Sequence, residues 1–207
     1  MCVFEKKAEE YDAWFEQHRM LYLSEVEAVR ALIPKDGTGV EIGVGTGRFS
    51  LPFGISKGVE PAAAMRKWAR KKGLNPLAGR AEALPFSDQS FHFALLITTL
   101  CFVQDPLKAL QEIYRILLPK GQILLGLIDA DSSLGKTYLA RKTESVFYRE
   151  ARFFCVKETT KLLEKAGFSN FHYRQTLFHL PLKLQAPDVV REGFGEGGFV
   201  VISGVRT

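Results

Sequence analysis

Three glycines at alternate positions, Gly43, Gly45 and Gly47, follow an apolar segment that begins at Val40. Glycine lets the backbone turn tightly and approach a ligand without a Cβ atom in the way. An apolar strand, a glycine-rich turn and the start of a helix are the usual form of a site for a nucleotide phosphate or a nucleoside. The residues around the turn have to indicate which of these ligands it binds.

The spacing of the glycines argues against two common phosphate-binding motifs. A dinucleotide-binding turn needs the pattern G-x-G-x-x-G, but Arg48 stands where its third glycine would be. The G-x-x-x-x-G-K-[ST] pattern of nucleoside triphosphate binding is absent as well. A nicotinamide-dependent oxidoreductase is therefore not favoured.

Two acidic residues flank the turn in a way that favours a cationic nucleoside. Glu41 stands two residues before the first glycine, where a carboxylate would repel a pyrophosphate but attract a cation. Glu60 ends a second predicted strand, where an acid can accept both hydroxyls of a ribose. S-adenosylmethionine combines a ribose with an ammonium and a sulfonium group, so it fits this pair.

Five ordered segments resemble the signatures of class I S-adenosylmethionine-dependent methyltransferases. Among these, the small quinone-biosynthesis-like methyltransferases are the most similar group. The resemblance covers about residues 11–167. Its segments are Glu41-Ile42-Gly43-Val44-Gly45-Thr46-Gly47-Arg48-Phe49, Gly58-Val59-Glu60-Pro61 with Met65, Ala81-Glu82-Ala83-Leu84-Pro85-Phe86, Arg115-Ile116-Leu117-Leu118-Pro119-Lys120-Gly121-Gln122, and Lys165-Ala166-Gly167-Phe168.

The resemblance implies how the chain binds S-adenosylmethionine and releases S-adenosylhomocysteine. Glu41 and the glycine backbone would hold the methionine end, and Glu60 the ribose hydroxyls. Ala81, by its backbone N–H, and Glu82 would face the adenine. Thr98 would line the point of methyl transfer. The full set of expected cofactor-binding residues is Tyr11, Glu41, Gly43, Val44, Gly45, Gly47, Glu60, Pro61, Met65, Ala81, Glu82 and Thr98.

Three residues depart from the family pattern. Glu41 replaces the usual aspartate and is one methylene longer, Arg80 stands where an acid is common, and His92 stands where aspartate is frequent. Without an acid at position 80, the adenine amino group would depend on Glu82 or the backbone. A capping role at the start of a strand is expected for His92.

No catalytic residue and no metal site are expected. The sulfonium already activates the methyl group for in-line displacement, so the protein mainly binds, orients and excludes water. A general base is needed only if the acceptor must lose a proton. Cys2, Cys101 and Cys155 lie far apart and form no C-x-x-C pair, which argues against a zinc site or a disulfide framework.

Alternating strands and helices predict an α/β fold with a doubly wound, mostly parallel, seven-stranded sheet of the Rossmann-like methyltransferase type. The last strand should be antiparallel, because no helix separates it from the strand before it. Besides the strand before the glycines, the expected strands span 55–60, 74–78, 91–98, 122–128, 171–178 and 199–205, and the expected helices include 62–72 and 157–166.

The chain of 207 residues is expected to form a single domain, 1–207. Residues 1–33 are predicted to form a helical cap over the site, and residues 129–155 an insertion on the acceptor side. Both segments are rich in aromatic residues, including Tyr11, Trp14, Phe147 and Tyr148. They predict a pocket for a small-molecule acceptor, for which an aromatic group is expected.

The net charge of +5 raises the alternative of a nucleic-acid methyltransferase. The basic run from Arg66 to Lys72 is better explained as the solvated face of a helix. Residues 98–102 also lack the Asn/Asp-Pro-Pro-aromatic motif typical of base-amino methylation, so a nucleic-acid partner is not favoured. A non-catalytic sensor of the cofactor is a third alternative, and nothing in the sequence indicates an oligomeric state.

No apolar run approaches the length of about 20 residues that spans a bilayer. The segment from Met1 to Lys7 lacks the apolar core of a signal peptide. A cytoplasmic location is therefore expected.

Overall fold

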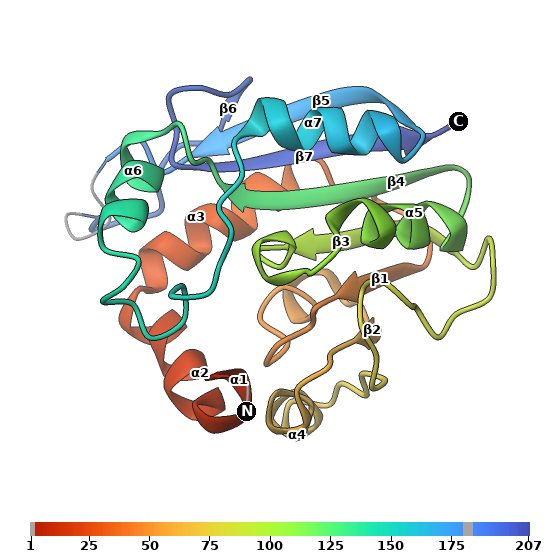
Figure 1. Cartoon of the computed structure of the whole chain (residues 1–207), viewed down its shortest axis with the longest axis horizontal. Helices are drawn as coiled ribbons and strands as arrows, with labels where there is room; N and C mark the ends of the chain where they lie inside the picture. Colours follow the sequence, from red (N-terminus) through yellow and green to blue (C-terminus); the bar gives the residue numbers. More distant parts are fainter. Residues whose placement is uncertain (1–2, 180–183) are drawn as a thin grey trace.

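A computed structural model describes residues 3–179 and 184–207. Its centre is a seven-stranded sheet in the order β2-β1-β3-β4-β7-β5-β6 (Figure 1). The strands are β1 Gly39–Ile42, β2 Lys57–Val59, β3 Phe91–Ile97, β4 Leu117–Ile128, β5 Phe168–Thr176, β6 Arg191–Glu192 and β7 Phe199–Arg206.

The directions of the strands confirm the predicted architecture. β2, β1, β3 and β4 pair in parallel, and β7 is antiparallel to both of its neighbours, β4 and β5. β5 therefore points the same way as β4, and only β7 and the short β6 run against the rest. The fold is the expected α/β fold with a mostly parallel sheet and an antiparallel last strand.

One predicted strand is nearly lost, and an unpredicted one completes the sheet. Residues 74–78 contribute only an isolated bridge, in which Leu77 N–H donates to Gly58 O at 2.8 Å and Glu60 N–H donates to Leu77 O at 3.0 Å. Pro76 lacks the N–H that a longer ladder would use. The seventh strand is instead β6, a two-residue strand at the opposite edge.

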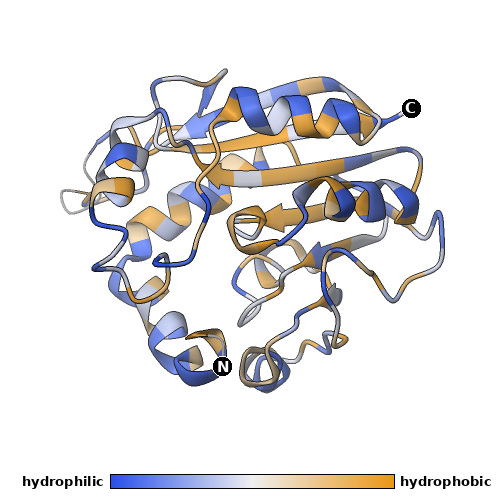
Figure 2. Ribbon diagram, in the orientation of Figure 1, coloured by the Kyte–Doolittle hydropathy of each residue, from blue (hydrophilic) through white to orange (hydrophobic). Residues whose placement is uncertain are grey.

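Helices cover both faces of the sheet. They are α1 Val3–Lys6, α2 Ala8–Gln17, α3 Arg19–Arg30, α4 Ala63–Lys71, α5 Pro106–Ile116, α6 Ser133–Ala140 and α7 Val156–Lys165. α5 and α7 pack through Leu110, Ile113 and Leu163 into one core cluster, and α3 packs into another with Phe93 and Phe199. Figure 2 shows the apolar strands between helices whose outer sides are hydrophilic.

The glycine turn of this chain is not followed by the α-helix that is usual for sites of this form. Turns and a short 3₁₀ helix, η1 (Leu51–Phe53), take its place. Pro52 supplies no N–H for a continuing helix, and Gly54 ends the segment in the left-handed conformation at φ +65°. The segment between the glycines and β2 is therefore short and contains no α-helix.

The helices predicted in residues 1–33 are present, but they divide between two places. α1 and α2 lie beside α4, where Ala8 packs with Ala62 and Met65 (Figure 1). α3 lies on the face of the sheet, with Val26 and Val29 in its core. Among all helices of the described residues, none is long and apolar enough to cross a membrane.

Candidate functional site

The glycine turn has a backbone that requires its glycines. Gly43, Gly45 and Gly47 have φ values of +78°, +55° and +87°, which side-chain-bearing residues rarely adopt. A Cβ atom at Gly43 would also overlap the side chain of Thr99, and one at Gly47 would overlap Leu74. Val59 O, at the end of β2, accepts hydrogen bonds from Gly43 N–H at 2.8 Å and Val44 N–H at 3.1 Å, which ties the turn to that strand.

Glu60 lies directly against this turn, as its place at a strand end predicted. Its Oε2 accepts a hydrogen bond from Gly45 N–H at 3.0 Å, and its Oε1 accepts one from Ala62 N–H at 2.8 Å. Burial raises the pKa of Glu60, although these two hydrogen bonds act in the opposite direction. A carboxylate held in this way still has oxygen lone pairs for hydroxyl donors.

Glu41 brings a second buried carboxylate to the same place. It is 2% exposed, and the hydroxyl of Ser50 donates to its Oε2. Burial raises the pKa of Glu41 to about 8, the hydrogen bond from Ser50 lowers it, and the nearby charge of Glu60 raises it further. A cation that enters between these carboxylates would favour their ionised forms.

Tyr11 of α2 covers the turn. A Cβ atom at Gly45 would lie 3.5 Å from Cε1 and 3.7 Å from the hydroxyl oxygen of Tyr11. The ring packs edge-on against Phe15 and Phe147, with centroids 5.2 and 5.6 Å away. Burial, then the charges of Glu60 and Glu41, raise the pKa of Tyr11, so its hydroxyl keeps its proton.

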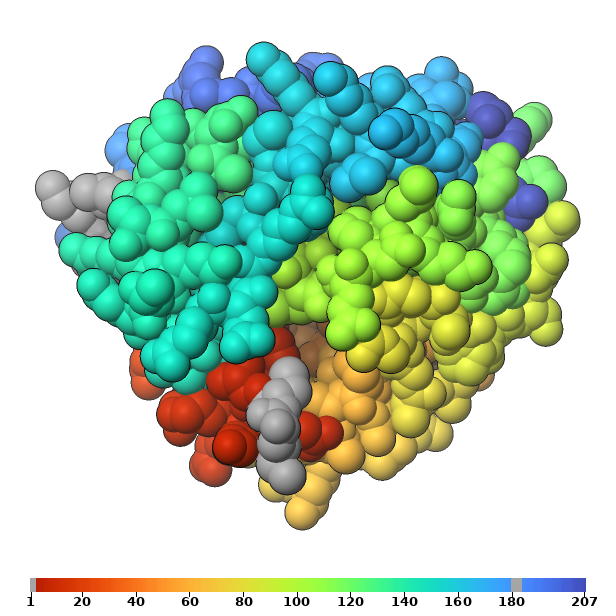
Figure 3. Space-filling model, viewed as in Figure 1, coloured from red at the N-terminus to blue at the C-terminus, as the bar shows by residue number. Residues whose placement is uncertain are grey.

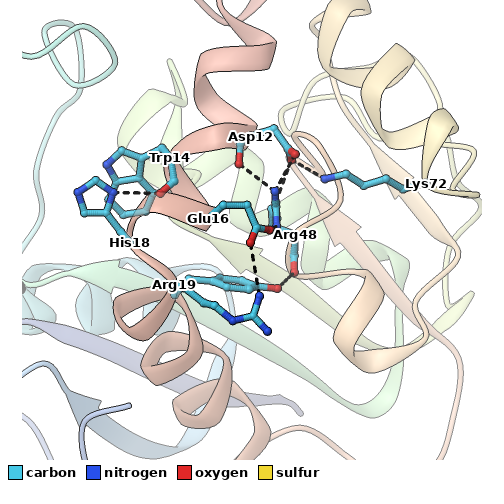
Figure 4. A network of polar contacts seen from close by, with 8 residues as sticks. Asp12, Trp14, Glu16, His18, Arg19, Arg48 and Lys72 are labelled. Carbon is cyan, nitrogen blue, oxygen red and sulfur yellow. Dashed lines mark hydrogen bonds and ion pairs between the residues drawn. The ribbon is translucent and has the colours of Figure 1, made fainter. Parts of the chain in front are cut away.

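A network of ion pairs holds α2 on the turn (Figure 4). Arg48 donates to Asp12 Oδ1 at 2.9 Å and Oδ2 at 2.7 Å, and to Glu16 Oε1 at 2.6 Å. Lys72 of the segment after α4 also pairs with Asp12, and the hydroxyl of Tyr22 donates to Arg48 O at 2.6 Å. The arginine that interrupts the dinucleotide pattern therefore fastens the N-terminal helices to the glycine turn.

Thr98 stands at the end of β3 in a strained conformation. Its φ is +47°, an outlier for a β-branched residue that costs about 1–3 kcal/mol. Thr98, Cys101 and Tyr148 line a small cavity of about 20 Å³, roughly the space of one water molecule. Figure 3 shows the surface indented nearby, between the red N-terminal segment and the yellow-green residues around position 100.

The remaining expected site residues are placed less uniformly. Pro61 is exposed at the start of α4, whereas Met65 is 1% exposed and lies under α1 and α2. Ala81 is buried in the core. The carboxylate of Glu82 accepts hydrogen bonds from the N–H groups of Gln104 at 2.9 Å and Asp105 at 3.4 Å, so its contacts are those of a cap before α5.

His92 lies near the start of β3, at the ends of the parallel strands opposite to the glycine turn. This position agrees with its expected capping role. Its Nδ1 accepts a hydrogen bond from Thr38 N–H at 3.0 Å, and its own N–H donates to Thr38 O at 2.9 Å. Thr38 precedes β1, so both contacts are at the amino ends of the parallel strands.

The similarity to known proteins agrees with this geometry. Residues 40–125 match the family described as a methyltransferase domain. A solved S-adenosylmethionine-dependent methyltransferase from Thermotoga maritima, described as a possible histamine N-methyltransferase, is 51% identical. It matches with a TM-score of 0.97 over 99% of both chains. This chain belongs to the class I S-adenosylmethionine-dependent methyltransferases.

Other relatives of this methyltransferase are less informative about its acceptor. An uncharacterized protein of Methanocaldococcus jannaschii is 46% identical over 98% of both chains. Demethylmenaquinone methyltransferase of Bacillus licheniformis is 26% identical over 83% of this chain and 88% of its own length. The chain is an enzyme, and its cofactor is S-adenosylmethionine.

The donor set of the methyltransferase suits this cofactor. The glycine turn packs closely against Thr99, Leu74 and Tyr11, and the two buried carboxylates beside it suit a ligand that is cationic and carries hydroxyls. Among residues 3–179 and 184–207, no group of three His, Cys, Asp or Glu side chains could hold a metal ion. The sequence analysis did not identify the ion pair of Asp12 with Arg48 or its role in holding α2 on the turn. The available signal was that an arginine stands at position 48, where a dinucleotide-binding motif has glycine.

Proposed function

We propose that this methyltransferase transfers a methyl group to a small-molecule acceptor that binds among aromatic side chains beside the glycine turn. The proposal is carried by one observation, a continuous aromatic cluster that begins at Tyr11 over Gly45. Phe147 packs on Tyr11, Phe102 stacks on Tyr148 with centroids 6.0 Å apart, and Tyr148 packs on Tyr138 at 5.4 Å.

This cluster supports a small acceptor because of where its members come from. Tyr138 belongs to α6, and Phe147 and Tyr148 to the loop that follows, so both lie in residues 129–155, which we propose as the acceptor-side insertion. Phe4 of α1 packs on Phe102 at 5.0 Å and closes the cluster from the N-terminal side. These aromatic faces, contributed by the N-terminal segment and by residues 129–155, suit a compact, partly aromatic molecule.

The residues proposed to hold the cofactor follow the expected set. Glu41 and the backbone of Gly43, Val44, Gly45 and Gly47 would hold the methionine end, and Glu60 the ribose hydroxyls. Pro61, Met65, Ala81 and Glu82 would line the adenine side, Tyr11 would cover the cofactor, and Thr98 would face the acceptor. When bound, S-adenosylmethionine supplies a methyl group activated by its sulfonium.

The chain's own contribution would be to orient and to exclude water. Holding two reactants in a productive orientation can lower a barrier by about 7–11 kcal/mol. Tyr11 keeps its proton and covers the turn, and Thr98 lines a small cavity at the end of β3. No general base is part of the proposal.

Two relatives' names support a small acceptor. The Thermotoga protein is described as a possible histamine N-methyltransferase, and the Bacillus protein as a demethylmenaquinone methyltransferase. The basic run after Pro61 does not favour nucleic acid, since Arg66 donates to Glu60 O and Pro61 O, and Lys72 pairs with Asp12. The cytoplasmic location stays a prediction.

Calorimetric titration of S-adenosylhomocysteine into Glu60→Ala tests the cofactor site. Loss of charge-assisted hydrogen bonds to ribose costs about 1.5–3 kcal/mol each, so affinity should fall at least about tenfold. Glu158→Ala, at an exposed glutamate paired with Arg152, is the matched control and should bind as the wild type does. Unchanged affinity in Glu60→Ala would contradict the assignment.

Formation of S-adenosylhomocysteine from S-adenosylmethionine then tests turnover. Small aromatic amines and phenols form one set of acceptors, and transfer RNA forms the other. Product with the first set alone is expected. Product only with RNA would reverse the choice of acceptor, and cofactor binding without any product would favour a sensor.

A further inference from the structure

The segment from Arg80 to Ser90 includes the residues proposed to line the adenine side of the cofactor site. It contains no helix and only one isolated bridge, between Arg80 and Ala83. The backbone groups of such a segment have no ladder or helix of their own, so its shape depends on hydrogen bonds to neighbouring elements. Here the neighbour is α5 together with the residues just before it.

Arg115, near the end of α5, donates to three groups of this segment. Its guanidinium donates to Leu84 O at 3.1 Å, to Phe86 O at 2.8 Å and to Asp88 Oδ1 at 2.7 Å. A planar guanidinium has five N–H donors in fixed directions, so one arginine can hold several acceptors at once. The side chain therefore fixes alternate residues of the segment.

Glu112, three residues earlier on α5, completes this arrangement. Its Oε2 accepts a hydrogen bond from Leu84 N–H at 2.8 Å, and its Oε1 accepts one from Arg115 Nε at 2.8 Å. The side chain is only 15% exposed, and the hydrogen bond from Arg115 lowers the pKa of Glu112. The N–H and the C=O of Leu84 are therefore both bonded to this pair of charged side chains.

The first part of the segment is fixed to the residues before α5. Glu82 Oε1 accepts a hydrogen bond from Gln104 N–H at 2.9 Å. Ala83 N–H donates to Arg80 O at 3.1 Å, which closes a turn around Ala81 and Glu82. Within residues 3–179 and 184–207, Ala81 N–H donates to no acceptor of the chain. This is the N–H that the proposed function directs at the adenine.

We propose that Glu112 and Arg115 are positioning residues for the adenine of the cofactor. They set the shape of residues 81–88, so that Ala81 N–H and the Glu82 carboxylate meet the base at fixed positions. The inference rests on the proposed function and deepens it, from the residues that line the adenine to the two side chains that hold them. Residues that contact a ligand recognise it sharply only when other side chains lock them in place.

The consequence is recognition of the base, in addition to binding of the cofactor as a whole. The amino group of adenine donates hydrogen bonds, and the neighbouring ring nitrogen accepts one. Hypoxanthine has a carbonyl and an N–H at these two positions, so it reverses the pattern. A site with fixed polar groups rejects such an analogue, because its own groups are left without partners. A loosely held segment can rearrange and loses this discrimination.

The test measures the affinities of S-adenosylhomocysteine and S-inosylhomocysteine by calorimetry, and the ratio of the two is the readout. The wild type should bind the adenine compound at least about tenfold more tightly. Arg115→Gln should reduce the ratio to about threefold or less, mainly by weakening S-adenosylhomocysteine. Arg115→Lys keeps the charge but not the planar fork, so its ratio should lie between these values.

Glu112→Gln is a milder second variant, and it decides the question if Arg115→Gln does not fold. It keeps an oxygen for Leu84 N–H but loses the charge that holds Arg115, so its ratio should also fall. Arg152→Gln is the charge-matched control. Arg152 is 65% exposed and pairs with Glu158 outside this segment, so its loss should leave the ratio unchanged.

A merely structural role of Glu112 and Arg115 would weaken both compounds by the same factor and leave the ratio unchanged. That result, or a wild type without a preference for the adenine compound, would overturn the inference.

The affinity of the wild type for S-adenosylhomocysteine separates this inference from the proposed function. Normal affinity together with an unchanged ratio in the variants would refute the positioning role alone. A wild type that does not bind S-adenosylhomocysteine would refute the proposed cofactor site, and the inference with it.

Discussion

At the scale of single residues, the fold buries carboxylates almost completely. Glu41 and Glu25 both have a pKa of about 8, and burial is the main cause for each. Keeping carboxylates of this kind in a protein interior costs stability as the pH rises, because their ionised forms are poorly solvated there. The cost should therefore be visible in the pH dependence of unfolding.

Glu25→Gln should make the protein more stable at alkaline pH. In the native state Glu25 holds its proton up to about pH 8, while in the unfolded chain it loses it near 4.5. Stability contributed by this group is therefore present at low pH and falls as pH rises through that range. Near pH 9 the free energy of unfolding of the variant should exceed that of the wild type by several kcal/mol, up to about 5 kcal/mol for a pKa shift of this size.

Thermal unfolding at several pH values measures this difference, which should shrink toward pH 5. Among the described residues, burial and, to a smaller extent, the charge of Glu25 raise the pKa of Tyr11, Tyr22, Tyr138 and Tyr148, so these tyrosines stay uncharged in this range. A difference between variant and wild type that does not change with pH would show that Glu25 is neutral or solvated throughout.

Part of the site could be predicted from sequence at this scale, because some roles follow from strand position alone. Glu60 meets the glycine turn since parallel strands β1 and β2 end at the same edge of the sheet. Asp12 and Glu25 could not be predicted in this way. Their importance comes from which side chains pack around them, and helical periodicity indicates a buried face without naming its neighbours.

At the scale of elements, ion pairs of Arg48 attach α2 to the glycine turn. Arg48 and Asp12 are both mostly buried, with side chains 14% and 11% exposed. Removing one partner of a buried ion pair is far more costly than removing one at the surface, because the other charge is left uncompensated. α2 carries Tyr11, so its attachment also positions the cover of the turn.

Arg48→Met should release α2 from the turn. Lys72 still pairs with Asp12, so we expect a loss of about 2–3 kcal/mol in the free energy of unfolding, below the largest values for buried pairs. Hydrogen exchange followed by mass spectrometry should show faster exchange in Ala8–Gln17, and S-adenosylhomocysteine affinity should fall several-fold. Arg30→Met, which breaks only the exposed pair with Glu27, should change neither.

Unchanged exchange in α2 after Arg48→Met would show that aromatic packing alone holds the helix. The sequence predicted helices in residues 1–33 but assigned all of them to a cap. α3 instead lies on the sheet, because its apolar residues Val26 and Val29 meet Phe93 and Phe199 there. An apolar stripe predicts that a helix is buried, and only the tertiary structure decides against which surface.

At the scale of the whole molecule, the candidate site brings together residues that lie far apart in the sequence, from Tyr11 to Tyr148. Tyr11, Gly45, Glu60, Thr98 and Tyr148 lie in different segments, and the parallel strands bring their carboxyl ends to one edge. The cofactor turn and the aromatic cluster share Tyr11. Two ligands that both order one side chain should not bind independently.

Binding of S-adenosylhomocysteine and of 2-phenylethylamine should therefore be positively coupled. The first ligand fixes Tyr11 over the turn, so the second finds one wall of its pocket already ordered. Coupling of this kind is typically 1–3 kcal/mol, or roughly 5–150-fold in affinity. Because binding free energies are reciprocal, calorimetric titrations in either order must give the same factor.

Tyr11→Ala should abolish the coupling, whereas Tyr11→Phe, which keeps the ring, should retain most of it. Trp14→Ala is the control on the same helix, since Trp14 packs on Phe15 and His18 and makes no ring contact with Phe147 among the described residues. If the wild type binds the amine equally with and without S-adenosylhomocysteine, the two sites are independent. Tyr11 would then be a cover for the cofactor alone, and the acceptor pocket would be preformed by α6 and the loop that follows it.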